Sequence, residues 1–217
     1  GLVPYGADET SDGSLNSADG GFSFWAAVHS RQFWTICLAM FGFGYCVQTV
    51  MVHIVLYATE FGISAVGRIN FGKESPKVDI KGRPITGGVS DRIGNKPAIM
   101  ISFIVVGATL LWLLIARELW MFYLFAAFFG FAYGGIAVLQ SPLVAELFGL
   151  RSHGIILGAV TFSITIGGAV GSVLTGYMFD VTGSYQLSFI MCIAIILVAW
   201  ILTLLLRPTY NKKGINE

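Results

Sequence analysis

Residues 97–116 read PAIMISFIVVGATLLWLLIA, a run of 20 residues without Asp, Glu, Lys or Arg. About 20 apolar residues make a helix long enough to cross the hydrocarbon core of a bilayer. Four longer segments also lack these charges: residues 32–59, 119–145, 152–179 and 181–206. Backbone polar groups in lipid must be satisfied within the segment, and no segment alternates like a membrane barrel strand. We therefore expect five membrane-spanning helices.

The composition excludes several other classes of protein. Of the 217 residues, 55% are hydrophobic and 12% are charged, whereas soluble domains carry about 25% charged residues. The net charge of +1 offers no basic surface for nucleic acid. Cys37, Cys46 and Cys192 lie inside apolar segments and are interpreted as buried thiols. The chain has no nucleophile elbow, P-loop or metal-binding pair of His or carboxylates, so we expect no enzyme activity, cofactor or metal site.

Two polar stretches interrupt the apolar pattern. Residues 1–31 are rich in acidic residues, Gly and Ser, which predicts a flexible loop. The aromatic residues 22–34 are typical of a segment at the lipid headgroups. Because the chain begins with Gly, it is interpreted as part of a longer protein. Residues 67–81, GRINFGKESPKVDIK, hold six charges, each costing about 2.5–3.5 kcal/mol at the centre of a membrane helix. An exposed or poorly packed segment is predicted there.

The basic residues indicate the orientation of the last four helices. Those on one side are Arg92, Lys96, Arg151, Arg207, Lys212 and Lys213. Only Arg117 falls on the other side. Basic residues are enriched in cytoplasmic loops, so the C-terminus is predicted to be cytoplasmic. The N-terminal loop shares that side if residues 62–88 span the membrane and lies outside if they do not; both alternatives remain open.

Several motifs resemble those of one transporter family. GGVSDRIGNK, residues 87–96, is similar to the G-x-x-x-D-R-x-G-[RK]-[RK] loop of the major facilitator superfamily, with Asn95 in place of a basic residue. GLVPYGAD near the start resembles the monocarboxylate-transporter and oxalate/formate-antiporter branch. Three later motifs resemble it too: VHIVLYATEFGIS (52–64), SPLVAELFGLRSHGIILG (141–158) and GYMFDVTGSY (176–185). The family has twelve helices, and this chain looks like its C-terminal six, preceded by the central loop.

The resemblance implies an all-α, polytopic membrane helix bundle. We expect a cytoplasmic inter-half loop and interfacial segment in residues 1–31, the bundle in residues 32–207, and a cytoplasmic tail in residues 208–217. The predicted helices cover about residues 33–59, 97–116, 119–145, 153–179 and 184–206. Residues 62–88 mark a disrupted helix, the second of the half. Its length is kept while its apolar composition is lost, which favours a corrected frameshift in the gene sequence over a natural insertion.

Polar residues on the first predicted helix are candidates for substrate binding or proton coupling. Cys46, Thr49, His53 and Tyr57 are spaced by three, four and four residues, so they share one face. His53 either binds an anion or the coupling proton, or is a neutral histidine bonded to a neighbouring helix. The family often shows a histidine in this setting, and the resemblance therefore favours a cavity. Gln48 points away from this face and is interpreted as a helix-contact residue.

The third apolar segment supplies two further candidates. Tyr133 and Gln140 are seven residues apart and share a face. Ser141 and Pro142 follow, where we expect the helix to bend or end. Broken helices line the cavities of transporters, so Tyr133 and Gln140 are predicted to bind substrate. Packing is the alternative, and for Gln140 it is equally favoured.

Two groups of residues are predicted to serve gating and helix packing. The resemblance implies a cytoplasmic gate formed by Gly87, Asp91, Arg92, Gly94, Lys96, Glu146 and Arg151. A carboxylate such as Asp91 is favoured near a helix start, and Arg92 can pair with groups at the next cytoplasmic turn. The G-x-x-x-G pairs Gly154/Gly158 and Gly167/Gly171 predict close helix contacts.

These observations favour a secondary active transporter of small organic anions. The resemblance implies a monocarboxylate or related carboxylate, moved by proton symport or anion exchange with alternating access, in the plasma (inner) membrane. The expected partners are the small carboxylate substrate, a proton or counter-anion, the lipid bilayer and the missing N-terminal half, without nucleic acid. The alternative is a non-transporting partial carrier, truncated or frameshifted, or a carrier-derived sensor. Because the chain supplies one wall of the cavity, these residues alone are expected to give no saturable uptake.

Overall fold

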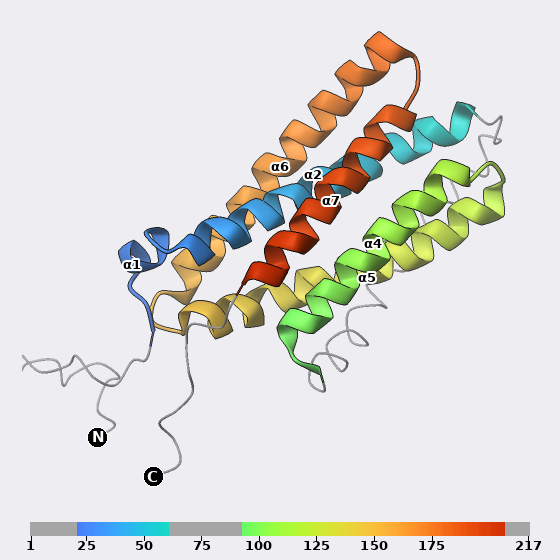
Figure 1. The fold of residues 1–217 in the computed structure, drawn as a ribbon. Helices are drawn as coiled ribbons and strands as arrows, with labels where there is room; N and C mark the ends of the chain where they lie inside the picture. Colours follow the sequence, from blue (N-terminus) through green and yellow to red (C-terminus); the bar gives the residue numbers. More distant parts are fainter. Residues whose placement is uncertain (1–20, 61–92, 207–217) are drawn as a thin grey trace, which may run out of the picture.

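Each of the five uncharged segments forms a single long helix (Figure 1). The structure, a computed structural model, describes residues 21–60 and 93–206. The helices are α2 Arg31–Glu60, α4 Asn95–Ile115, α5 Leu119–Phe148, α6 His153–Thr182 and α7 Gln186–Leu205, and a short helix, α1 Phe24–Val28, precedes α2. All five long helices are long and apolar enough to cross a membrane. The predicted all-α membrane bundle is therefore confirmed, while the predictions for residues 62–88, 67–81 and 208–217 lie outside the described residues.

Two helices continue further than the charge pattern predicts. α5 ends at Phe148 and α6 at Thr182, whereas the expected ends were residues 145 and 179. The extra turns carry Glu146 and Asp180, which are both exposed. A charged side chain ends the apolar segment, but the helix itself continues into the headgroup region, where that side chain reaches water.

Pro142 does not end its helix. α5 runs without interruption through Pro142 to Phe148. Proline lacks an N–H and removes one bond from the helix ladder. Membrane helices tolerate this because neighbouring groups and local adjustments satisfy the freed carbonyl. The sequence predicts that the helix bends or ends at this position, and the predicted end is wrong.

The contacts at the helix ends fix the direction of each helix. Asn95 at the start of α4 donates from Nδ2 to Glu146 Oε1 near the end of α5 at 2.6 Å. Lys96 Nζ donates to the Leu204 and Leu206 carbonyls at the end of α7, at 2.9 and 2.5 Å. We call the end of the bundle that holds these contacts the α5–α6 turn end, and the opposite end the α6–α7 turn end. α4 and α6 therefore begin at the α5–α6 turn end, where α5 and α7 finish.

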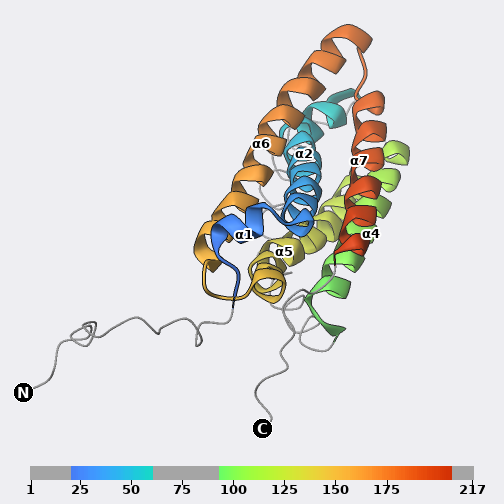
Figure 2. The same cartoon turned by 60° about the vertical axis from the view of Figure 1, so that its left-hand side comes forward.

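The α1 segment also lies at the α5–α6 turn end (Figure 2). Phe22 N–H donates to the Phe148 carbonyl at 2.8 Å. Edge-to-face contacts join the rings of Phe22, Phe33 and Phe148. Trp25 and Trp34 stay 71% and 63% exposed, as expected of indole rings at the headgroup level. The start of α2 thus lies at the same end of the bundle as the α5–α6 turn.

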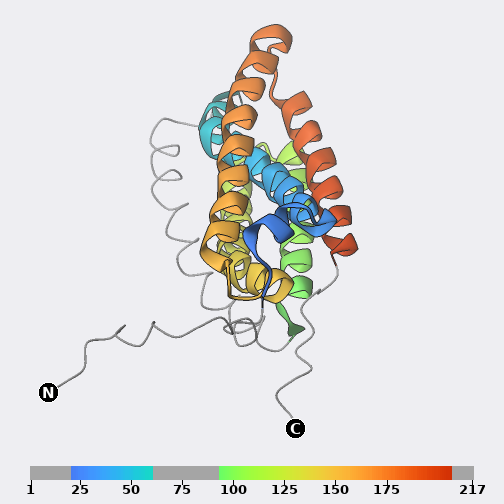
Figure 3. The same cartoon turned by 90° about the vertical axis from the view of Figure 1, so that its left-hand side faces the viewer.

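The helices follow one another around the bundle with one weak junction. α6 packs along α2, α2 along α7, α7 along α4, and α4 along α5 (Figure 3). The contact between α5 and α6 is much smaller. The core consists of aliphatic and aromatic side chains from these helices. Because α5 and α6 touch so little, the described helices leave an opening along that junction.

Glycines bring the backbones of α2 and α6 into contact. A Cβ atom added at Gly167 would overlap the carbonyl of Phe41, and one added at Gly44 would overlap the carbonyl of Ile164. A Cβ atom at Gly171 would lie 2.5 Å from the Tyr45 carbonyl oxygen. Because glycine has no side chain, it lets the backbones of membrane helices approach closely enough for van der Waals packing.

The other predicted glycine pair behaves differently. An added Cβ atom at Gly154 or Gly158 would have nothing within 4 Å in the described part of the chain. The G-x-x-x-G spacing alone therefore does not identify a contact. Gly154 and Gly158 are exposed, whereas Ile156 and Val160 of the same stretch are buried, so the two glycines lie on a face of α6 that does not pack on a described helix.

The different surroundings of Gly167 and Gly158 make these two residues a matched pair for substitution. We expect Gly167→Ala to reduce stability by about 1–3 kcal/mol, because the new methyl group forces two backbones apart. Gly158→Ala adds the same methyl group in open space and should change stability by less than about 0.5 kcal/mol. Unfolding by sodium dodecyl sulfate, followed by tryptophan fluorescence, measures both. Equal effects of the two variants would contradict the assigned contact.

Candidate functional site

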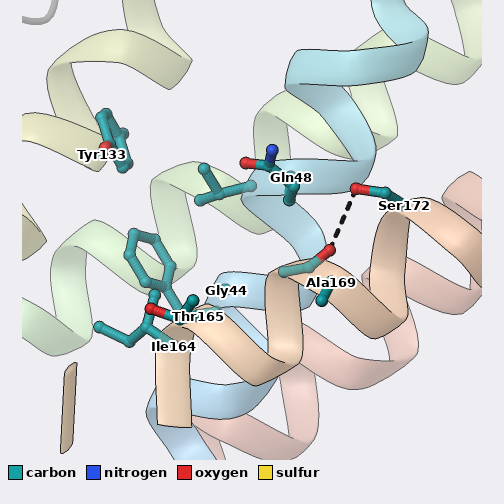
Figure 4. Close-up of a pocket in the computed structure, with 10 residues that line it drawn as sticks. Gly44, Gln48, Tyr133, Ile164, Thr165, Ala169 and Ser172 are labelled. Carbon is teal, nitrogen blue, oxygen red and sulfur yellow. Dashed lines mark hydrogen bonds between the residues drawn. The ribbon is translucent and has the colours of Figure 1, made fainter. Parts of the chain in front are cut away.

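A groove of about 400 Å³ opens where α5 separates from α6. Its walls come from α2, α5 and α6 (Figure 4). The polar lining residues are Gln48, Tyr133, Thr165 and Ser172, and the large apolar ones are Phe43, Val47 and Ile164. The volume lies within the range of about 300–1,000 Å³ of small-molecule sites, which combine an apolar lining with a few polar groups.

Small residues and one aromatic pair shape this groove. An added Cβ atom at Gly168 would lie 3.2 Å from Gln48 Cβ, so the missing side chain leaves room for the glutamine. Phe43 of α2 stacks on Tyr133 of α5, with ring centroids 6.0 Å apart and an interplanar angle of 23°. The stacked rings join α2 to α5 in the lining of the groove.

The polar groups of the groove are neutral hydrogen-bonding groups. Gln48 offers an amide, and Tyr133, Thr165 and Ser172 offer hydroxyl groups. Ser172 Oγ donates to the Gly168 carbonyl at 3.1 Å (Figure 4). Among the described residues that line the groove there is no Lys, Arg, Asp or Glu. This lining can bind a small polar group by hydrogen bonds, and any full charge on a ligand needs a partner from elsewhere.

Gln48 lines the groove, although the sequence interpretation gives it only a helix contact. Its side chain is exposed on the groove, and its Cβ atom lies beside Gly168 of α6. Helix periodicity correctly places Gln48 away from Thr49 and His53, because adjacent residues differ by about 100°. The sequence interpretation expects the cavity on the face of Thr49 and His53, whereas this groove lies on the Gln48 side of α2. The signal that could have found it is Gly44, one turn before Gln48, which marks the side of α2 nearest α6.

His53 lies under the groove, in the contact between α2 and α6. Its Nε2–H donates to the Ser172 carbonyl at 3.2 Å, because a carbonyl oxygen can only accept. The imidazole is 7% exposed, and its ring centroid lies 5.3 Å from that of Tyr185. Nδ1 is buried and has no hydrogen-bond partner within residues 21–60 and 93–206. The structure thus joins His53 to a residue that also lines the groove.

Three other predicted site residues make helix contacts instead of lining the groove. Thr49 Oγ1 shares a 3.1 Å hydrogen bond with Thr175 of α6. Gln140 Nε2 donates to Thr161 Oγ1 at 2.9 Å. Tyr57 is fully buried, and its hydroxyl donates to the Leu113 carbonyl at 3.4 Å. Of the five predicted residues, only Tyr133 contributes to the groove surface.

The described part of the predicted gate is an anchor between helix ends. Glu146 accepts from Asn95, and Arg151 is exposed in the turn that follows α5. Gly94 precedes α4 with a φ of 90°, a conformation that favours glycine. Lys96 binds the last carbonyls of α7. The remaining predicted gate residues, Gly87, Asp91 and Arg92, lie outside the described residues.

Comparison with known proteins identifies the family. Residues 80–217, well over half of the chain, match the family model of the Major Facilitator Superfamily. The chain belongs to this superfamily. It is also 26% identical over 166 residues to monocarboxylate transporter 13 of Rattus norvegicus and, with the same values, to that of Bos taurus. These matches cover 76% of the chain but 38% of each relative, so the chain spans well under half of the relatives that it matches.

The match to the Major Facilitator Superfamily concerns the C-terminal part of this chain. The matched region contains α4 to α7 completely, and hence the α5 and α6 walls of the groove. α2, with Gln48 and His53, lies before it. The weak α5–α6 junction is therefore a feature of the family region itself.

Lys96 offers a test of the helix-end anchor. A lysine that binds the last carbonyls of a helix satisfies groups without an intrahelical partner and complements the helix dipole. We expect Lys96→Met to reduce stability by about 1 kcal/mol. Arg117→Met is the matched control, since Arg117 is exposed in the α4–α5 turn. Thermal unfolding in detergent measures the stability of both variants. The anchor would be refuted if Lys96→Met were as stable as Arg117→Met and the unsubstituted protein.

Proposed function

We propose that this chain forms one half of a secondary active carrier for small organic anions, a monocarboxylate or a related carboxylate. The groove between α2, α5 and α6 is the observation that carries the proposal, because it combines apolar walls with an amide and hydroxyl groups. The resemblance to proteins named monocarboxylate transporter 13 supports the substrate class. Transport proceeds by alternating access, coupled to proton symport or anion exchange.

Gln48 and Tyr133 are assigned to substrate recognition. They reach the groove from α2 and α5 and can donate an amide N–H and a phenol O–H to a carboxylate. Hydrogen bonds to a charged group are stronger than neutral ones. The opposite charge for the carboxylate comes from outside the described lining, and the N-terminal half of the carrier, which would close the groove, is one source.

The basic residues support an orientation for this carrier. Arg31, Lys96 and Arg151 lie at the α5–α6 turn end, whereas Arg117 lies at the α6–α7 turn end. Cytoplasmic ends of membrane helices carry an excess of Lys and Arg. We assign the α5–α6 turn end and the C-terminus to the cytoplasm, in the plasma or inner membrane.

Uptake by a reconstituted carrier tests recognition. The chain is co-expressed with an N-terminal half of a related carrier and assayed in vesicles with radiolabelled carboxylates of increasing length. We expect saturable uptake, with Gln48→Leu and Tyr133→Phe each raising the half-saturating concentration about tenfold or more. Gln186→Leu is the control, because Gln186 is exposed at the start of α7. Absence of uptake by every combination would favour a non-transporting partial carrier or sensor.

His53 is assigned to proton coupling. It is buried next to the groove wall, and histidine changes charge between about pH 5 and 8. In the symport mechanism, acidification outside stimulates uptake. His53→Ala should flatten this dependence of uptake rate on external pH while leaving the protein folded. An unchanged pH profile would assign His53 to packing alone.

A further inference from the structure

The short helix α1 is attached to the bundle by one face. It contacts both α2 and α6 (Figure 2). Phe24 packs edge-to-face on Phe33 of α2, with ring centroids 6.5 Å apart, and Ala27 is fully buried. Ser30 Oγ donates to the Ala27 carbonyl at 2.6 Å and accepts from the Phe33 N–H at 3.2 Å. These contacts fix the position of α1 at the start of α2 and leave its other face free.

The outward face of this region is aromatic and basic. Trp25 and Trp34 are among the most exposed aromatic residues of the described chain. Trp34 Nε1 donates to the Val28 carbonyl at 3.0 Å, so its indole lies beside α1. His29 and Arg31, which lie between the two tryptophans in the sequence, are also exposed. Indole rings favour the headgroup level of a bilayer, where a neighbouring guanidinium reaches phosphate oxygens.

The α5–α6 turn adds a second arginine to this region. An added Cβ atom at Gly21 would lie 3.2 Å from Arg151 Cβ. Phe22, the next residue, donates to the Phe148 carbonyl, and the ring centroids of Phe148 and Phe33 are 6.3 Å apart. Arg151 therefore emerges beside the chain that leads into α1, and its side chain is exposed. We call the exposed side chains Trp25, His29, Arg31, Trp34 and Arg151 the α1 surface.

The two arginines of the α1 surface have no acidic partner among residues 21–60 and 93–206. Glu146 at the same end of the bundle accepts from Asn95. A guanidinium has five N–H donors in a planar arrangement that matches two oxygens of a phosphate group. The α1 surface thus offers positive charge and hydrogen-bond donors next to amphipathic rings.

The α6–α7 turn end has the opposite charge. It also presents an indole, since Trp120 is 55% exposed. Trp120 Nε1 donates to Glu118 Oε2 at 2.6 Å. Acidic residues outnumber basic ones there, with Glu60, Glu118 and Asp180 against Arg117. The two ends of the bundle therefore share the aromatic residues but differ in the sign of the charge beside them.

We propose that the α1 surface binds the headgroups of anionic phospholipids. A soluble anion would satisfy Arg31 and Arg151 but would leave the indoles of Trp25 and Trp34 in water, whereas a lipid provides phosphate and an apolar boundary together. Each basic residue near an anionic leaflet strengthens binding about fivefold. The bound lipid links α1 to the turn before α6. This inference does not depend on transport.

Two tryptophans serve as matched reporters of lipid binding. The full chain is reconstituted in vesicles of phosphatidylcholine and phosphatidylglycerol, of which one lipid at a time is brominated close to the headgroup, because bromine quenches nearby indoles. The quenching lost in Trp25→Phe reports on the α1 surface, and that lost in Trp120→Phe reports on the opposite end. We expect a preference for phosphatidylglycerol of about tenfold or more at Trp25 and none at Trp120. Equal preferences at the two ends would overturn the proposal.

Charge variants test the arginines. Arg31→Gln and Arg151→Gln should each reduce the preference at Trp25 about fivefold, because each removes one basic residue from the surface. Arg117→Gln is the matched control and should leave the preference at Trp25 unchanged, since Arg117 lies at the other end of the bundle. A preference that survives both Arg31→Gln and Arg151→Gln would contradict the assignment of these arginines.

Two additions to the unmodified chain identify the source of the anion without any variant of the arginines. Raising the salt concentration from about 0.1 M to about 1 M shortens the Debye length from about 10 Å to about 3 Å and should remove most of the preference at Trp25. Millimolar inorganic phosphate should not displace the lipid. Displacement by phosphate would reject the lipid in favour of a soluble anion. Absence of any preference at Trp25 would reject it in favour of acidic residues of the same chain, such as Asp19.

Discussion

The backbone contact between α2 and α6 determines the geometry of everything around the groove. Gly44 and Gly167 leave no room for a side chain between the two helices. This contact sets the distance over which Thr49 meets Thr175 and His53 meets Ser172. It also leaves α5 on the far side of an opening lined by Gln48 and Tyr133. In lipid, where no hydrophobic force draws helices together, such close packing and a few polar bonds are the available sources of association.

The number and approximate position of the helices follow from the sequence because charge is so costly in the bilayer. Uncharged segments of sufficient length have one stable conformation there, so α4, with its 21 residues, could be placed almost to the residue. The ends of α5 and α6 could not, because Glu146 and Asp180 reach water while remaining helical. Pro142 also did not mark a helix end, since α5 continues through it. The relative direction of α2 required spatial contacts such as that between Phe22 and Phe148.

The candidate site was harder to predict for a different reason. Periodicity shows which residues share a face of a helix, and Thr49 and His53 do share one. It cannot show which neighbour that face meets. Thr49 and His53 meet α6, whereas Gln48, one residue away, meets the groove. Tyr133 was expected to line a cavity because a broken helix was predicted at Pro142; it lines the groove although α5 runs through Pro142 without interruption. The roles of these residues stay predictions.

The long sequence separation of the α2–α6 bonds has a consequence for biosynthesis. Thr49 and Thr175 are 126 residues apart, and His53 and Ser172 are 119 apart. Within this chain α2 is synthesised before α6, so α2 waits for a partner that is made much later. During that interval its glycine face and its two polar side chains need temporary cover from lipid, water or the insertion machinery, because an unsatisfied polar group in hydrocarbon is costly. Insertion of α2 and completion of its packing are therefore separate events, and the interval between them is when a nascent chain is most exposed to quality control.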